Sequence, residues 1–168
     1  NIGDTRAKLL DRLGEKGYMP LYAMISLAGI VMVAMGRGDA EFIAVWTPPM
    51  WTRMLTMLFM FISVFLFAAM FLPTNIKRWV HHPMLSFVAA WGLAHLFSNG
   101  DLASMIFFGG FFVFSLFKII SLTRRKSPEP YAPVAISKDI IVLVLAIVLF
   151  AGGLYGHPYV SGGITLIN

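Results

Sequence analysis

The chain has 168 residues, of which 58% are hydrophobic and none is cysteine, and it carries a formal charge of +5. So apolar a composition predicts an integral membrane protein rather than a soluble domain, and the lack of cysteine excludes disulfides, thiolate catalysis and thiolate metal sites. The basic residues lie between apolar segments rather than in a patch laced with aromatics, so we expect them to face anionic lipid and expect no nucleic-acid partner.

Five apolar segments follow one another along the chain, and each predicts a helix. Four of them approach the roughly 20 residues that a helix needs to cross the hydrocarbon core of a bilayer. The third is shorter, at about 14 residues or ~21 Å, and must tilt little, sit off-centre or lean on neighbouring helices. The sequence therefore predicts an all-α polytopic transmembrane bundle and a single membrane-embedded domain over residues 1–168. The predicted ranges are Met19 to Gly36, Thr52 to Leu72, Met84 to Phe97, Leu102 to Leu122 and Ile136 to Tyr155.

The segment before the first apolar range is basic and carries no apolar run, so it is not a signal peptide. Because the sequence starts at Asn1 rather than at a methionine, we expect a preceding segment, and with it a sixth, N-terminal span.

The charges between the apolar segments alternate along the chain. Basic residues gather before the first segment, between the second and third, at Lys77 and Arg78, and between the fourth and fifth, whereas the third connection holds only Asp101. By the positive-inside rule the first residue lies on the cytoplasmic side and the C-terminus on the opposite side. Trp46 and Trp51 fit an aromatic belt at the outer interface.

This topology separates the histidines into two groups. His81 and His82 lie at the inner end of the third segment, whereas His95 and His157 lie near the outer ends of the third and fifth. His82 and His95 are 13 residues apart on one helix, or about 20 Å along its axis, so they cannot bind the same metal ion. His95 and His157 can be neighbours across two helices.

His95 is the strongest candidate for a functional side chain. It follows Trp91 by four residues, so the two rings share one helix face, and an ionisable group at membrane depth usually faces the bundle interior and serves a function. The alternative is a neutral histidine bonded to a backbone carbonyl near the interface. His157 has the alternative of an interfacial histidine at a helix end. For His82, the alternative is a position near the N-cap of a helix that starts at Pro83.

The residues after His95 predict a turn. Asn99 and Gly100 supply positive-φ geometry, and Asp101 can cap the following helix, although a proton relay or a substrate contact is the alternative. Asn99 and Asp101 are also candidates to hydrogen-bond the ring of His95. The glycine pairs Gly109–Gly110 and Gly152–Gly153 permit close helix contacts.

The motifs for other chemistries do not occur. The sequence contains no phosphate loop, zinc-protease helix or serine elbow and no carboxylate pair inside the apolar ranges, which argues against a hydrolase, a phosphate-handling enzyme and an ion-coupled transporter.

The block "HPML", "W", "LAHL", "NGDLAS" and "FFGGF" within residues 82–111 resembles the signature of the NnrU family of bacterial membrane proteins, which has the plant zeta-carotene isomerases as relatives. The resemblance extends through "LGEKGYMPLYAMISLAG", "WTPPMW" and "YGHPYVSG" and so covers most of the chain.

The resemblance implies a multi-pass protein of the bacterial inner membrane that binds haem b and takes part in nitrogen-oxide metabolism in denitrifiers. His82, His95 and His157 match family histidines and His81 does not; with Trp91 they are the implied cofactor-binding residues, and His95 and His157 are the candidate iron ligands. The family also implies a preceding helix that bears a histidine. Two alternatives stay open: an accessory subunit of a larger membrane complex, and a haem-dependent isomerase of a carotenoid-like polyene.

Overall fold

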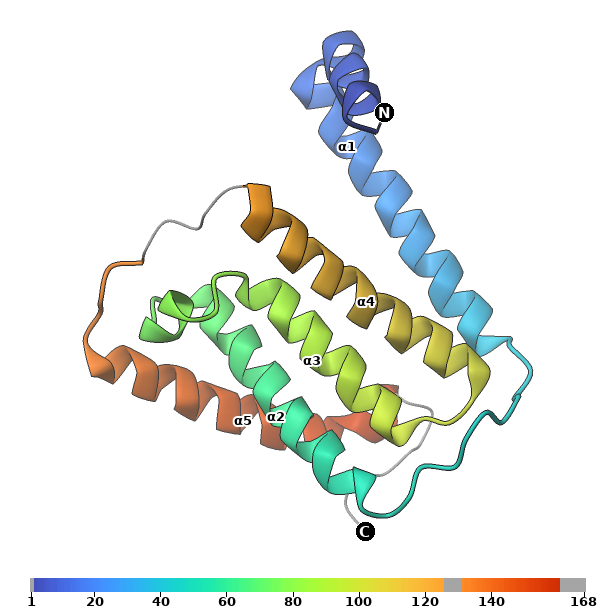
Figure 1. The fold of residues 1–168 in the computed structure, drawn as a ribbon, viewed down its shortest axis with the longest axis vertical. Coiled ribbons are helices and arrows are strands. Elements are labelled where there is room, and N and C mark those ends of the chain that lie inside the picture. The colour runs from blue at the N-terminus through green and yellow to red at the C-terminus, as the bar shows by residue number, and fades with distance from the viewer. Residues whose placement is uncertain (1, 126–130, 161–168) are drawn as a thin grey trace. The chain divides into compact units, whose positions relative to one another are not determined.

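The computed structural model describes residues 2–125 and 131–160, which fold almost entirely into helices (Figure 1). The apolar ranges form these helices because a chain in hydrocarbon must satisfy its backbone hydrogen bonds internally. The elements in chain order are α1 (Ile2–Gly38), α2 (Thr52–Phe71), the short 3-10 helix η1 (Asn75–Arg78), α3 (Pro83–Ser98), α4 (Leu102–Arg125) and α5 (Ile136–Val160).

The predicted helices are confirmed, with ends that differ by a few residues, except that the first one begins much earlier. α1 includes the basic N-terminal segment, and its regular geometry is interrupted at Gly14. Within the described residues four helices contain stretches long and apolar enough to cross a membrane, whereas α3 has 16 residues and is shorter. The membrane character of the chain is thus supported, and the count of five spans and a sixth N-terminal span stay predictions.

The chain divides into two compact units, Asn1–Glu41 and Phe42–Asn168. The first consists of α1, and the second contains the other helices. Within the second unit α3 lies between α2 and α4, and α5 packs against α2 (Figure 1). Small side chains bring α2 and α5 together, because Ala68 and Ala69 of α2 meet Val142 and Ala146 of α5 and all four are buried. That a single domain spans residues 1–168 stays a prediction.

A polar contact ties the connection after α2 to the first turn of α5. The Asp139 carboxylate accepts hydrogen bonds from the Thr74 hydroxyl at 2.5 Å, the Asn75 backbone N–H at 2.8 Å and the Asn75 side-chain amide at 2.6 Å. The same amide donates to the Val134 carbonyl at 2.9 Å. Because bonds to a charged acceptor are the stronger ones, this contact holds the start of α5 beside η1.

Candidate functional site

His95 lies in the last turn of α3, one turn after Trp91. Its Nδ1 is 2.9 Å from the Trp91 carbonyl oxygen, and the two rings lie side by side with centroids 4.9 Å apart. A carbonyl oxygen only accepts hydrogen bonds, so Nδ1 must carry the proton and the lone pair of a neutral ring lies on Nε2. The predicted shared face of Trp91 and His95 is confirmed. The Nδ1 contact is the backbone-carbonyl bond of the alternative reading, and it places the ring lone pair on Nε2, the kind of nitrogen through which a neutral imidazole binds a metal.

Aromatic side chains of α4 form a wall against these two residues. The Phe108 ring stacks on the imidazole of His95 with a centroid distance of 4.3 Å and an interplanar angle of 21°. Trp91 makes edge contacts with Phe107, Phe108 and Phe111 at 5.0 to 6.0 Å. Phe108 is buried, so this side of the imidazole is packed against hydrocarbon rather than water.

The wall stands this close because α3 carries a glycine where α4 crosses it. A Cβ built on Gly92 would lie 2.8 Å from the Phe108 carbonyl oxygen and 3.3 Å from the Phe112 Cβ and backbone nitrogen. Only a residue without a side chain permits this approach. Gly92 lies one turn before His95, so the crossing point also sets the distance between the imidazole and Phe108.

The glycine pairs singled out from the sequence do not make such contacts in the described residues. Nothing lies within 4 Å of a Cβ built at Gly110, Gly152 or Gly153, and Gly109 meets only the Leu96 Cδ2 at 3.9 Å. Of these four glycines only Gly109 is a position from which a Cβ would reach a neighbouring helix, at ordinary contact distance, and the tight crossing falls at Gly92.

The turn after His95 is confirmed in part. Asp101 caps α4, since its Oδ1 accepts from the Ser104 N–H at 2.8 Å. The positive-φ geometry predicted at Asn99 and Gly100 is wrong: within the described part of the chain only Gly14 has positive φ. Gly100 is required for a different reason, because a Cβ there would collide with the Trp46 carbonyl oxygen.

The residues before α2 bind the backbone of this turn, and we call residues 43–46 the strap. The N–H groups of Val45 and Trp46 donate to the Gly100 carbonyl at 2.8 and 3.1 Å, and the Leu102 N–H donates to the Ile43 carbonyl at 2.9 Å. The Trp46 indole N–H donates to the Asn99 carbonyl at 3.2 Å. The strap therefore holds the connection between α3 and α4. His95 lies just before this connection, in the last helical turn of α3. Trp51 is 62% exposed, and an aromatic belt of Trp46 and Trp51 stays a prediction.

Asn99 contacts the backbone of His95. Its side-chain amide and its backbone N–H donate to the His95 carbonyl at 2.8 and 2.9 Å, which satisfies a carbonyl left open at the helix end. The bond at the His95 ring nitrogen Nδ1 is made with the Trp91 carbonyl. That Asn99 and Asp101 also support the imidazole ring stays a prediction.

His82 lies at the other end of α3, at the N-cap position that the sequence offers as its alternative. It is the N-cap residue, Pro83 occupies the first turn, and the His82 side chain makes no capping hydrogen bond. Its Nε2 is buried and has no hydrogen-bond partner within residues 2–125 and 131–160. With α3 continuous between them, His82 and His95 are about 20 Å apart along the axis.

His157 lies in the last turn of α5, and the helix continues through Pro158 to Val160 rather than ending at the histidine. α5 packs on α2, whereas the Trp91 and Phe108 rings around His95 belong to α3 and α4. The described residues contain no group of three or more histidine, aspartate or glutamate side chains that could hold a metal ion. Pairing of His95 with His157 on one iron stays a prediction.

Sequence reasoning did not assign the three phenylalanines of α4 or Gly92 to the site. The spacing of Phe107 and Phe111, one turn apart with Phe108 beside them, was the available signal for a common helix face. Which helix that face would meet could not be inferred from spacing.

A family model described as "NnrU protein" matches residues 2–163 of the chain. No curated protein and no solved structure matches the chain.

Proposed function

The chain belongs to the NnrU family, and from that premise we propose that it is a membrane protein that binds haem b through the imidazole of His95. The observation that carries the proposal is the bond between His95 Nδ1 and the Trp91 carbonyl at 2.9 Å. Histidines that bind metals commonly donate their second ring N–H to a carbonyl or carboxylate, which fixes the tautomer and the ring orientation.

The residues around His95 fit a flat, apolar ligand with a metal at its centre. The stacked Phe108 covers one face of the imidazole, but the lone pair of Nε2 lies in the ring plane and points past that contact. With no cysteine in the chain, imidazole is the natural protein ligand for a haem iron. His82, whose buried Nε2 has no hydrogen-bond partner among the described residues, is a second imidazole that could bind a metal near the other end of α3.

Haem, when bound, supplies an iron centre for electron transfer or for binding a small ligand. The chain's own part is to present His95 at a fixed angle and to exclude water on the Phe108 side. The haem-binding protein then takes part in nitrogen-oxide metabolism. It lies in a bacterial inner membrane, with the first residue of the chain on the cytoplasmic side.

The test is the haem content of the full-length protein purified in detergent. The wild type and a His81→Ala control should show a Soret band and a pyridine haemochrome spectrum of haem b, and His95→Ala should lose both while keeping its helical circular dichroism. A wild-type protein without haem after expression with haem precursor would overturn the proposal and favour an accessory role in a membrane complex. A His95→Ala protein with full haem would remove His95 from the site.

A further inference from the structure

α1 is two helices joined at one residue. Gly14 has φ 63° and ψ 170°, whereas the residues on both sides are helical, and Figure 1 shows the change of direction near the N-terminus of α1. This backbone conformation is essentially restricted to glycine. A Cβ built on Gly14 meets nothing within 4 Å, so glycine is required there by conformation and not by space.

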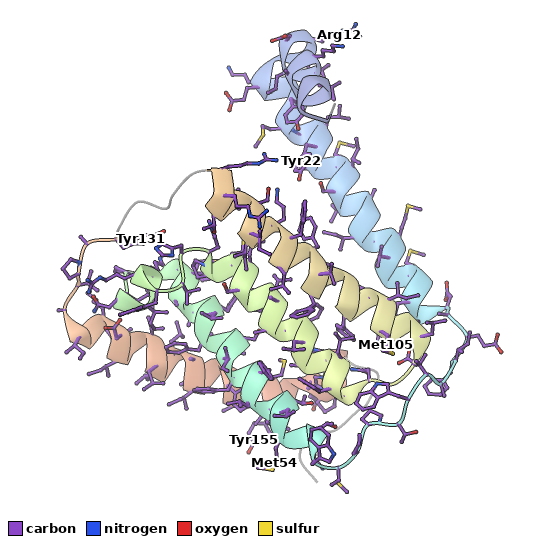
Figure 2. All side chains as sticks on the ribbon, in the orientation of Figure 1. Arg12, Tyr22, Met54, Met105, Tyr131 and Tyr155 are labelled. Atoms are coloured by element: carbon purple, nitrogen blue, oxygen red, sulfur yellow. The ribbon has the colours of Figure 1, made fainter. Side chains whose placement is uncertain are left out.

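The helix before Gly14 has an apolar face and a charged face. Leu9 and Leu13 are one turn apart and share a face, and both are exposed, at 37% and 44%. Lys8, Asp11 and Arg12 are also exposed. At 100° per residue Asp11 lies opposite the two leucines, whereas Lys8 and Arg12 lie together on one flank of the leucine face. Figure 2 labels Arg12 on this helix.

The position of this helix in the chain restricts what can cover its apolar face. α1 contains a candidate membrane span, Ala7–Gly38, and the charged residues just after Gly14 end at Lys16, before the long apolar range. If that apolar range crosses the membrane, the helix before Gly14 stands where the chain enters the bilayer. A helix with leucines on one face and lysine or arginine at the edge of that face lies at the boundary between the hydrocarbon and the water, with its cationic groups reaching lipid phosphates.

We propose that residues 2–13 form an interfacial helix that binds anionic lipid headgroups through Lys8 and Arg12, with Leu9 and Leu13 immersed in the bilayer and Gly14 as the joint. This inference does not depend on haem binding. It concerns the membrane surface and not the site at His95.

The absence of cysteine from the chain makes the proposal directly testable by site-directed spin labelling. Single cysteines at Leu9, Asp11 and Leu13 in the full-length protein are labelled with a nitroxide, in nanodiscs of phosphatidylcholine alone or mixed with phosphatidylglycerol. We expect the labels at positions 9 and 13 to collide with oxygen severalfold more than with a water-soluble nickel chelate, and the label at position 11 to show the reverse. Equal nickel access at all three positions overturns the proposal, and so does shielding of positions 9 and 13 from both reagents, which would indicate a protein contact.

The charge and the joint are tested by two further changes in the Leu13→Cys background. Phosphatidylglycerol should move the label deeper, and Lys8→Gln with Arg12→Gln should abolish this lipid dependence; a label depth that is the same in both lipids refutes binding of anionic headgroups. Gly14→Ala should favour a straight helix and raise nickel access at position 13, whereas Gly29→Ala, another position with nothing within 4 Å, should not. An unchanged label in Gly14→Ala refutes the role of the joint.

Discussion

Replacing Gly92 with alanine should push α3 and α4 apart at the point where they cross beside His95. The new methyl group would lie 2.8 Å from the Phe108 carbonyl oxygen and 3.3 Å from two atoms of Phe112. The first of these contacts is with helix backbone, which cannot rotate away as a side chain can. The two helices must therefore separate or shift, and the stacked contact of Phe108 with His95 must change.

The magnitude follows from two opposing terms. Overpacking a close contact costs about 1–3 kcal/mol, and alanine in place of glycine in a helix stabilises it by about 1 kcal/mol. Gly110→Ala is the matched control, because it lies on the partner helix α4 and nothing lies within 4 Å of its Cβ. The propensity term is common to both variants, so Gly92→Ala should be less stable than Gly110→Ala by about 1–3 kcal/mol.

The assay is thermal unfolding in detergent, followed by far-ultraviolet circular dichroism, with near-ultraviolet dichroism as a report on the packing of Trp91. For a chain of this size each kcal/mol corresponds to roughly 2–4 °C in Tm, so the two variants should be clearly resolved. A Gly92→Ala protein that melts at or above the temperature of Gly110→Ala, with an unchanged near-ultraviolet spectrum, would refute the close crossing.

Two further predictions concern contacts at the ends of helices, and a third concerns the membrane topology. Gly100→Ala should detach the strap, at a cost of about 1.5–4.5 kcal/mol for its three backbone hydrogen bonds at about 0.5–1.5 kcal/mol each; hydrogen exchange at the Val45 amide should accelerate, and unchanged exchange would contradict the collision with the Trp46 carbonyl. Asp139→Asn should lower Tm and speed exchange at the Asn75 amide, because a neutral amide accepts the three bonds less well; a variant as stable as the wild type would show that this contact is dispensable. A periplasm-active reporter fused to the C-terminus should be active, and an inactive fusion at normal expression would reverse the topology.

The helices could be predicted from the sequence because each long apolar range is bounded by polar residues, proline or glycine. The start of α3 at Pro83 and the cap of α4 by Asp101 rest on residues within one turn of the helix end, so local spacing was enough to find them.

The contacts that position the site could not be predicted because they join distant parts of the chain. The Trp46 indole binds a carbonyl 53 residues away, and the Asn75 amide binds Asp139 across 64 residues. Nothing in the sequence around Gly92 marks it, because its constraint comes from the Phe108 carbonyl of α4, which lies close to it where the two helices cross. Gly100 was assigned to a turn conformation because Asn-Gly is common in turns, but its actual constraint comes from the strap.

The central claim, that His95 binds the iron of haem b, is tested most directly by chemical rescue. His95→Gly removes the imidazole and leaves space for a free imidazole beside Phe108. We predict that the full-length variant purifies without haem, and that haem with free imidazole restores a Soret band that co-elutes with the protein, to a far smaller extent when imidazole is omitted. A His95→Gly protein that retains its full haem complement without imidazole, as His81→Gly should, would contradict the claim.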